Sequence, residues 1–114
     1  MLTSLRKWLN EEKKDNSIFD IVLYGSSVKG KSNPSDVDIA VIFRHGSLKD
    51  RLEKIREIKK KIKLKNKLDM KGLLLEDLFK PDFFARSGIF LEGISIFDGT
   101  YFCEKIGFSG CVFF

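Results

Sequence analysis

The stretch from Gly25 to Val41, which reads GSSVKGKSNPSDVDIAV, constrains the fold of this 114-residue chain more than any other. The residues before it, 18–24, are mostly β-branched or aromatic, which predicts a largely buried strand. Gly25 lets the chain turn sharply there toward a helix N-terminus, where free backbone N–H groups favour anions. A polar loop follows, and residues 36–43 predict a second strand that opens with two aspartates.

Those two aspartates, Asp36 and Asp38, are two residues apart in the predicted second strand. Side chains at this spacing point to the same face of a sheet, so each carboxylate raises the cost of ionising the other. A divalent cation removes that cost, and Mg²⁺ is commonly held by one or two carboxylates together with substrate phosphates. The pattern therefore predicts a site for a nucleotide with Mg²⁺.

Three features of the stretch are shared with a known family. They are Gly25-Ser26 separated by nine residues from Asp36-Val37-Asp38, the pair Lys29-Gly30, and the run from Ser35 to Val41. Together they resemble the signature of the minimal nucleotidyltransferases, within the superfamily related to DNA polymerase beta. The resemblance extends over residues 18–98 and is specific within 25–41.

The resemblance implies an α/β (α+β) fold, namely a polymerase-beta-like palm with a small mixed sheet backed by helices on one face. It also implies a nucleotidyltransferase that moves a nucleoside monophosphate to a hydroxyl acceptor, with AMP from ATP the favoured transfer. In this scheme Gly25, Ser26 and Lys29 bind the nucleotide phosphates. The residues expected to hold two Mg²⁺ ions and to carry catalysis are Asp36, Asp38 and Asp69.

The third carboxylate of that set has more than one candidate. Asp69 lies in an apolar setting within residues 67–75, which predict a third strand. In the superfamily this carboxylate comes from a strand adjacent to the one with the paired aspartates. Glu76 and Asp77 are the alternatives, although they fit better as the first turn of a short helix, 76–79.

In a single domain of this length we expect none of the further domains with which larger relatives grip a template or an acceptor. The resemblance therefore implies that a partner protein presents the hydroxyl, namely a HEPN-type toxin for which this chain is the antitoxin. A non-catalytic antitoxin that only covers its partner is the alternative. A nucleic-acid binder is less favoured, and the oligomeric state stays open.

The net charge of +5 is unevenly distributed, because residues 49–71 contain 11 Lys or Arg and 4 Asp or Glu, a balance of +7. A basic face can hold phosphates or an acidic partner. No aromatic residues interleave these lysines as stacking platforms for bases. A solvated helical face is therefore the favoured interpretation.

The remaining pattern predicts one domain over residues 1–114, in the cytoplasm, because no apolar run is long enough for a signal peptide or a membrane span. Helices are expected over 2–14 and 82–92, and residues 93–99 are expected to form a short strand that leads into a turn. A further helix begins after Ser47 as N-cap and carries the apolar stripe Leu48, Leu52, Ile55, Ile58 and Ile62.

Four further residues and the tail are of interest. Asp20 is expected at a sheet edge or strand end, and His45 in a solvated loop. Two cysteines and one histidine cannot complete a zinc site by themselves. Cys103 and Cys111 are therefore expected to be buried thiols, with a disulfide between them as the alternative. The aromatic tail, 100–114, is either core or a patch that a partner covers.

Overall fold

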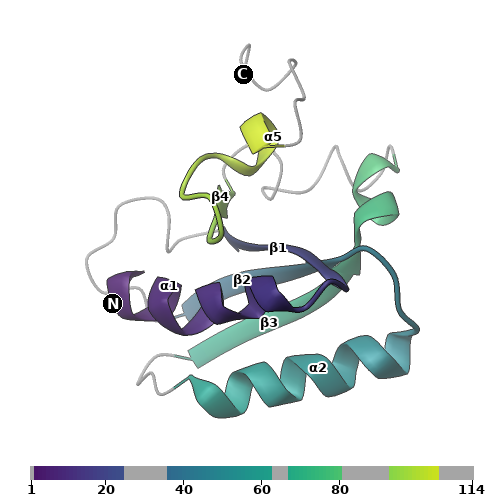
Figure 1. Cartoon of the computed structure of the whole chain (residues 1–114), viewed down its shortest axis with the longest axis horizontal. Helices are drawn as coiled ribbons and strands as arrows, with labels where there is room; N and C mark the ends of the chain where they lie inside the picture. The colour runs from purple at the N-terminus through teal and green to yellow at the C-terminus, as the bar shows by residue number, and fades with distance from the viewer. Residues whose placement is uncertain (1, 25–35, 63–66, 81–92, 106–114) are drawn as a thin grey trace.

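The computed structural model describes residues 2–24, 36–62, 67–80 and 93–105, and these form a small sheet with helices on both sides (Figure 1). The elements, in chain order, are α1 (Leu2–Asn10), the 3-10 helix η1 (Glu11–Lys14), β1 (Ile18–Tyr24), β2 (Asp36–Phe43), α2 (Leu48–Lys61), β3 (Lys67–Leu74), the 3-10 helix η3 (Leu75–Phe79), β4 (Ile94–Ser95) and α5 (Phe102–Lys105).

The four strands form one mixed sheet in the order β3-β2-β1-β4. β1 pairs antiparallel with both β2 and β4, whereas β2 and β3 are parallel. Parallel neighbours need a crossover connection, and α2 supplies it. The predicted mixed sheet of a polymerase-beta-like fold is thus confirmed.

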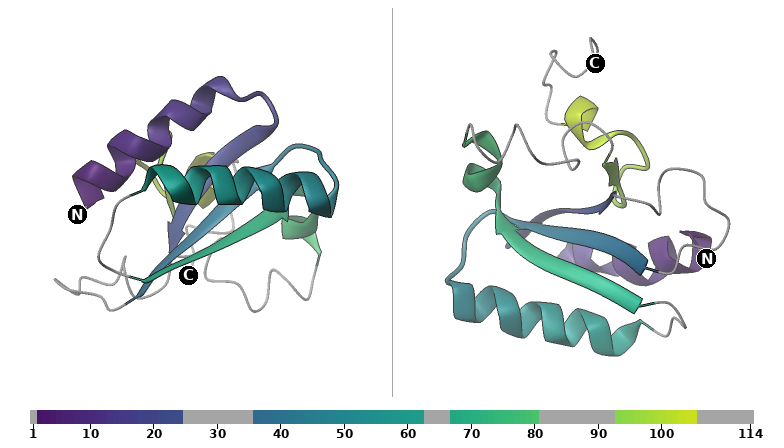
Figure 2. Two further views of the ribbon diagram at one scale, coloured as in Figure 1. Left: turned by 90° about the horizontal axis from the view of Figure 1, so that it is seen from below. Right: turned by 180° about the vertical axis from the view of Figure 1, so that it is seen from behind.

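The helices α1 and α2 cover one face of this sheet (Figure 2). Strand alternation supplies the apolar side chains of that face, since every second residue of β2 points toward the helices. The buried cluster there comprises Leu9, Ile18, Ile21, Leu23, Val37, Ile39, Val41, Phe43, Ile55, Ile58, Ile62, Met70, Ile96 and Phe97. We call this the covered face.

The opposite face of the sheet has a second, smaller apolar cluster. Val22, Ala40 and Ile42 of the central strands pack there against Leu78 of η3 and Phe102 of α5. Phe102 is fully buried, so the tail contributes to the core at this residue. Residues 106–114, including Cys111, lie outside the described residues, as does the side chain of Cys103.

The start of α2 agrees with prediction, but its apolar stripe does not. The Ser47 hydroxyl accepts a hydrogen bond from the Asp50 backbone N–H, as an N-cap should. Leu48 and Leu52, however, are 62% and 45% exposed, so the first two positions of the stripe were wrong.

The cause lies in how α2 meets β3. Gly72 has no side chain, and a Cβ at that position would meet Ile55 and Arg51. The Arg51 guanidinium also donates to the Gly72 carbonyl at 3.2 Å. The helix therefore presents Arg51 and Ile55 to the sheet at this level, which turns Leu52 toward solvent.

Three further expectations have different outcomes. Asp20 does not lie in an edge strand, because β1 runs between β2 and β4, and its side chain is fully buried. It does lie close to a strand end, the start of β1, beside a register shift between Ile18 and Asp20. The short strand and turn expected within 93–99 are β4 and the turn that follows it. The helix expected over 82–92 lies outside the described residues.

Candidate functional site

The sheet places Asp38 and Asp69 directly opposite each other. In the parallel pair of β2 and β3, Asp38 is the register partner of Asp69. In the antiparallel pair of β1 and β2, Tyr24 is the register partner of the same Asp38. Register partners share a face, so these three residues form one row across three neighbouring strands. We call this the carboxylate row.

The row lies on the face of the sheet opposite α1 and α2. Val37 and Ile39, on either side of Asp38 in β2, belong to the covered cluster, so alternation turns Asp38 the other way. Figure 2, in its right panel, shows β2 and β3 from this side, with α1 behind them. Asp38 is half-buried and Asp69 is exposed, so a soluble ligand can reach this carboxylate.

The electrostatics of the row are visible at Tyr24. Burial raises the pKa of the Tyr24 hydroxyl, and the negative charges of Asp38 and Asp69 raise it further. Lys71 opposes this rise, because its positive charge stabilises the ionised phenol. Tyr24 therefore experiences both carboxylates and one lysine, which shows that the four side chains belong to one electrostatic group.

The other predicted site residues are described only in part or not at all. Asp36 opens β2 with Lys67 as its register partner, but its side chain lies outside the described residues. Gly25, Ser26 and Lys29 lie outside them altogether. Their roles remain predictions.

The alternative third carboxylates lie at the far end of β3. Glu76 and Asp77 belong to η3, which follows the last residue of that strand, whereas Asp69 is near its beginning. At about 3.3 Å per residue, the five-residue path from Asp69 to Leu74 already covers roughly 17 Å. Asp77 is moreover paired with Lys80 at 2.9 Å. Only Asp69 of these three is brought to Asp38.

Sequence reasoning missed Tyr24 and Lys71 as members of the site. A signal existed for both of them. Tyr24 directly precedes Gly25-Ser26 in the sequence and is the last residue of the strand predicted over 18–24. Lys71 follows Asp69 by two residues and therefore shares its face.

The donor set of the row suits Mg²⁺. Mg²⁺ prefers hard oxygen ligands, and carboxylates supply them. Adjacent strands are about 4.8 Å apart, so two carboxylates on them can share one ion and leave room for water and phosphate. Among the side chains that the structure describes, no three His, Cys, Asp or Glu gather into a larger cluster. The described part of the set is thus the pair Asp38 and Asp69, with Asp36 adjoining it in sequence.

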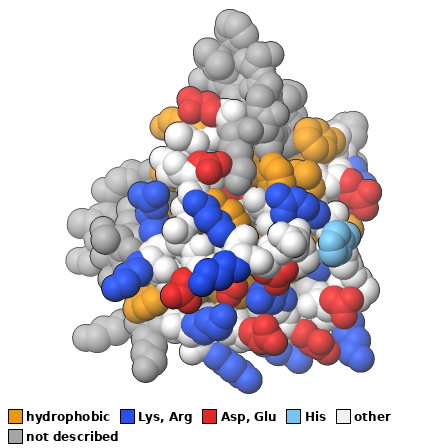
Figure 3. Space-filling model, viewed as in Figure 1, with side chains coloured by type: hydrophobic (Ala, Val, Ile, Leu, Met, Phe, Trp, Pro, Cys, Tyr) orange, Lys and Arg blue, Asp and Glu red, His pale blue; other side chains and the backbone are white. Residues whose placement is uncertain are grey.

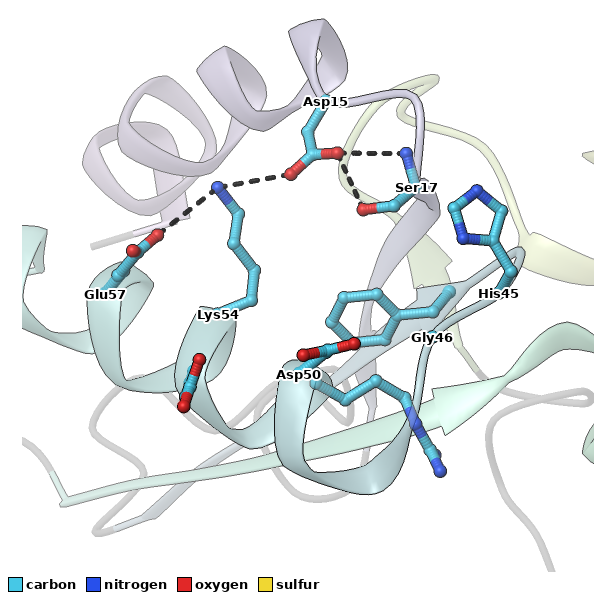
Figure 4. A pocket seen from close by; sticks show the side chains of 10 residues that line it. Asp15, Ser17, His45, Gly46, Asp50, Lys54 and Glu57 are labelled. Carbon is cyan, nitrogen blue, oxygen red and sulfur yellow. Dashed lines mark hydrogen bonds and ion pairs between the residues drawn. The ribbon is translucent and has the colours of Figure 1, made fainter.

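A separate polar pocket of about 310 Å³ lies past the other end of β2 (Figure 4). The Lys54 ammonium pairs there with the carboxylates of Asp15 at 3.3 Å and Glu57 at 3.7 Å. His45 is exposed at its rim, in the loop after β2, as predicted. The pair of Lys54 with Asp15 joins α2 to the segment before β1, whereas Lys54 and Glu57 both belong to α2, and neither pair includes a residue of the carboxylate row.

The basic stretch of α2 carries neighbouring acidic groups. Lys54 and Lys61 both pair with Glu12, a residue that is only 5% exposed. Figure 3 shows acidic and basic side chains interspersed over this side of the molecule. No helix among the described residues combines the length and the apolar content needed to cross a membrane.

Comparisons with known proteins agree with this architecture. A family model described as "Polymerase beta, Nucleotidyltransferase" matches residues 6–98. A search of curated proteins gives no significant match.

Two solved structures share the fold with a TM-score of 0.58, and each alignment covers 98% of this chain and 84% of the other. One is a mutant of the toxin–antitoxin complex MntA–HpeT with two Asp→Glu replacements, at 16% identity. The other, at 18% identity, is a tri-AMPylated HEPN toxin from Shewanella oneidensis in complex with an MNT antitoxin.

Proposed function

We propose that this chain, which belongs to the polymerase beta nucleotidyltransferase family, transfers AMP from Mg-bound ATP to a hydroxyl group of a partner protein. The observation that carries the proposal is the register of the sheet. It sets Asp69 of β3 opposite Asp38, near the start of β2. The family match over residues 6–98 supports the reaction class.

Each residue has a role in this reaction. Asp36 and Asp38 would hold the Mg²⁺ that accompanies the triphosphate. Together with Asp69 they would also hold a second Mg²⁺. The two ions would supply charge stabilisation. Gly25 and Ser26 would bind the β- and γ-phosphates.

The acceptor oxygen forms a bond to the α-phosphorus while the bond to the β-phosphate breaks, so pyrophosphate leaves. We assign Asp69 to the acceptor side, where its carboxylate would orient the attacking hydroxyl and accept the proton that the hydroxyl loses. Most of the acceleration would come from positioning and charge stabilisation.

The partner we propose is a HEPN-type toxin, for which this chain would be the antitoxin. The support is the shared fold over 98% of the chain with an MNT antitoxin bound to an AMPylated HEPN toxin. In the MntA–HpeT mutant, the two replaced aspartates are two residues apart. Asp36 and Asp38 have the same spacing.

The test is transfer of label from α-labelled ATP to the product of the neighbouring gene, followed by size-exclusion chromatography of the mixture. We expect Mg²⁺-dependent labelling of that partner and a stable complex. Asp38→Asn should form the complex without labelling it. A complex that the wild-type chain never labels would favour the non-catalytic antitoxin, and the absence of both results would refute the pairing.

A further inference from the structure

Lys71 occupies a position that the proposed chemistry does not yet use. It follows Asp69 by two residues in β3, and its register partner in β2 is Ala40. Ala40 in turn pairs with Val22 of β1, one level along the sheet from the carboxylate row. Lys71 therefore lies on the same face as Asp38 and Asp69, one step further along the strands.

Tyr24 lies close enough to Lys71 to sense its charge. Two strand spacings of about 4.8 Å separate β1 from β3, so only long side chains can approach each other across β2. Tyr24 packs against the apolar cluster that includes Ala40. The positive charge of Lys71 lowers the pKa of the Tyr24 hydroxyl, whereas Asp38 and Asp69 raise it. Lys71 therefore acts in the same electrostatic group as both carboxylates.

A cation in this place acts differently on the two species that can enter the site. A bare Mg²⁺ ion is repelled by the ammonium while the carboxylates attract it. The complex of Mg²⁺ with ATP is net negative, so the same ammonium attracts its phosphates. The sign of the interaction with Lys71 therefore reverses between the free metal and the metal–nucleotide complex.

We propose that Lys71 makes the site select Mg²⁺ together with its nucleotide over Mg²⁺ alone. This rests on the proposed function, because it assumes that the carboxylate row is the metal site. Lys71 is a selecting residue here, and the transfer itself is left to the aspartates.

The test is calorimetric titration of Lys71→Met with Mg²⁺ alone and, separately, with the Mg²⁺ complex of a non-hydrolysable ATP analogue. We expect the affinity for bare Mg²⁺ to rise about three- to tenfold and the affinity for the complex to fall by a similar factor, the scale of a partly exposed charge interaction. Both shifts should shrink at high ionic strength.

Matched variants separate this effect from a loss of structure. Lys49→Met removes the same charge from an exposed position at the start of α2 and should leave both affinities unchanged. Lys71→Arg restores the charge and should return both affinities toward the wild-type values.

Two outcomes would overturn the proposal. If Lys71→Met weakens both affinities together, Lys71 only supports the local structure. If its affinity for bare Mg²⁺ equals that of Lys49→Met, Lys71 does not act on the metal. The proposed function fails separately, when the wild-type chain does not bind the metal–nucleotide complex, and the bare-metal comparison still decides the role of Lys71.

Discussion

On the face covered by α1 and α2, β2 presents Val37, Ile39 and Val41, all fully buried. On the opposite face the same strand presents Asp38 near its start, and further along it joins the apolar cluster under η3 and α5. One strand therefore has a uniform face, whose residues only pack, and a divided face, whose polar end can bind a charged ligand.

The comparison shows that neighbouring residues of one strand can differ completely in what they tolerate. At Val37, Ile39 and Val41 the covered face has no place for a charge, because these side chains lie within an apolar cluster and the desolvation cost would be uncompensated. The polar end of the other face needs charge, because its proposed ligand is a metal with phosphates. Each prediction below tests one side of this difference.

The largest effect is expected from placing a charge on the covered face. Ile39→Asp should unfold the chain, because burying an unpaired carboxylate costs about 4 kcal/mol or more, a large part of the stability of a small domain. Thermal unfolding followed by circular dichroism measures this. A cooperative transition at the wild-type temperature would show that the face is not buried as described.

The matched variant is its neighbour in β2. Asp38→Asn should leave the unfolding temperature nearly unchanged, yet lower the affinity for the Mg²⁺–nucleotide complex more than tenfold, since one of the metal ligands loses its charge. Calorimetry with and without Mg²⁺ measures the loss. Unchanged affinity would remove Asp38 from the binding site.

The second effect separates binding from chemistry within the carboxylate row. Asp69→Asn should keep nucleotide affinity within about tenfold, roughly 1.4 kcal/mol. Transfer should fall on the order of a hundredfold or more, because Asp69 is assigned to the acceptor side and acts on the transition state. Labelling of the partner and nucleotide binding are measured on the same protein.

Two conservative variants serve as controls for that assignment. Glu76→Gln and Asp77→Asn change carboxylates at the other end of β3, which the sheet keeps away from Asp38. Both should transfer at the wild-type rate. Loss of transfer in either of them, together with retention in Asp69→Asn, would mean that the third carboxylate had been misassigned.

Sequence alone predicted the part of the fold that depends on local pattern. The strands over 18–24 and 36–43, the helix capped by Ser47 and the strand around Asp69 all follow from periodicity and capping. The shared face of Asp36 and Asp38 stays a prediction, because the side chain of Asp36 lies outside the described residues. These features need no knowledge of which segments meet.

What sequence could not supply is the register between strands. That Asp38 lies opposite Asp69, and not nearer Glu76, depends on how β3 pairs with β2 over a crossover of more than twenty residues. The inclusion of Tyr24 and Lys71 in the site depends on the same pairing. The exposure of Leu52 depends on the close approach of α2 to Gly72, which is also a tertiary effect.

A smaller effect is expected at the charged edge of the covered face. The Ser17 hydroxyl donates to the Asp15 carboxylate at 2.6 Å and lowers the pKa of that carboxyl below its ordinary value of 3.8. A depressed carboxyl pKa adds stability above the unfolded value, and that stability is lost as the pH falls through the folded value.

Ser17→Ala should therefore be less stable than the wild type at neutral pH, by less than about 1 kcal/mol because Asp15 is partly exposed. The difference between their unfolding temperatures should disappear as the pH falls well below 3.8, where Asp15 is protonated in both. Nucleotide transfer should not change. A difference that persists in acid would assign the effect to packing of the serine.

The smallest effect is expected at Leu52, whose place in the stripe had suggested the core. Its side chain is 45% exposed, and Arg51 occupies the contact with β3 at this level of α2. Leu52→Ala should therefore change the free energy of unfolding by no more than about 0.5 kcal/mol, the range of ordinary surface substitutions. Ile58→Ala, on the same helix but 1% exposed, should lower the free energy of unfolding by about 2–5 kcal/mol.

Denaturant titration of both Leu52→Ala and Ile58→Ala compares the two losses directly. Equal losses would mean that α2 is rotated, with Leu52 packed against the sheet, and the covered face would then extend to the first turn of the helix.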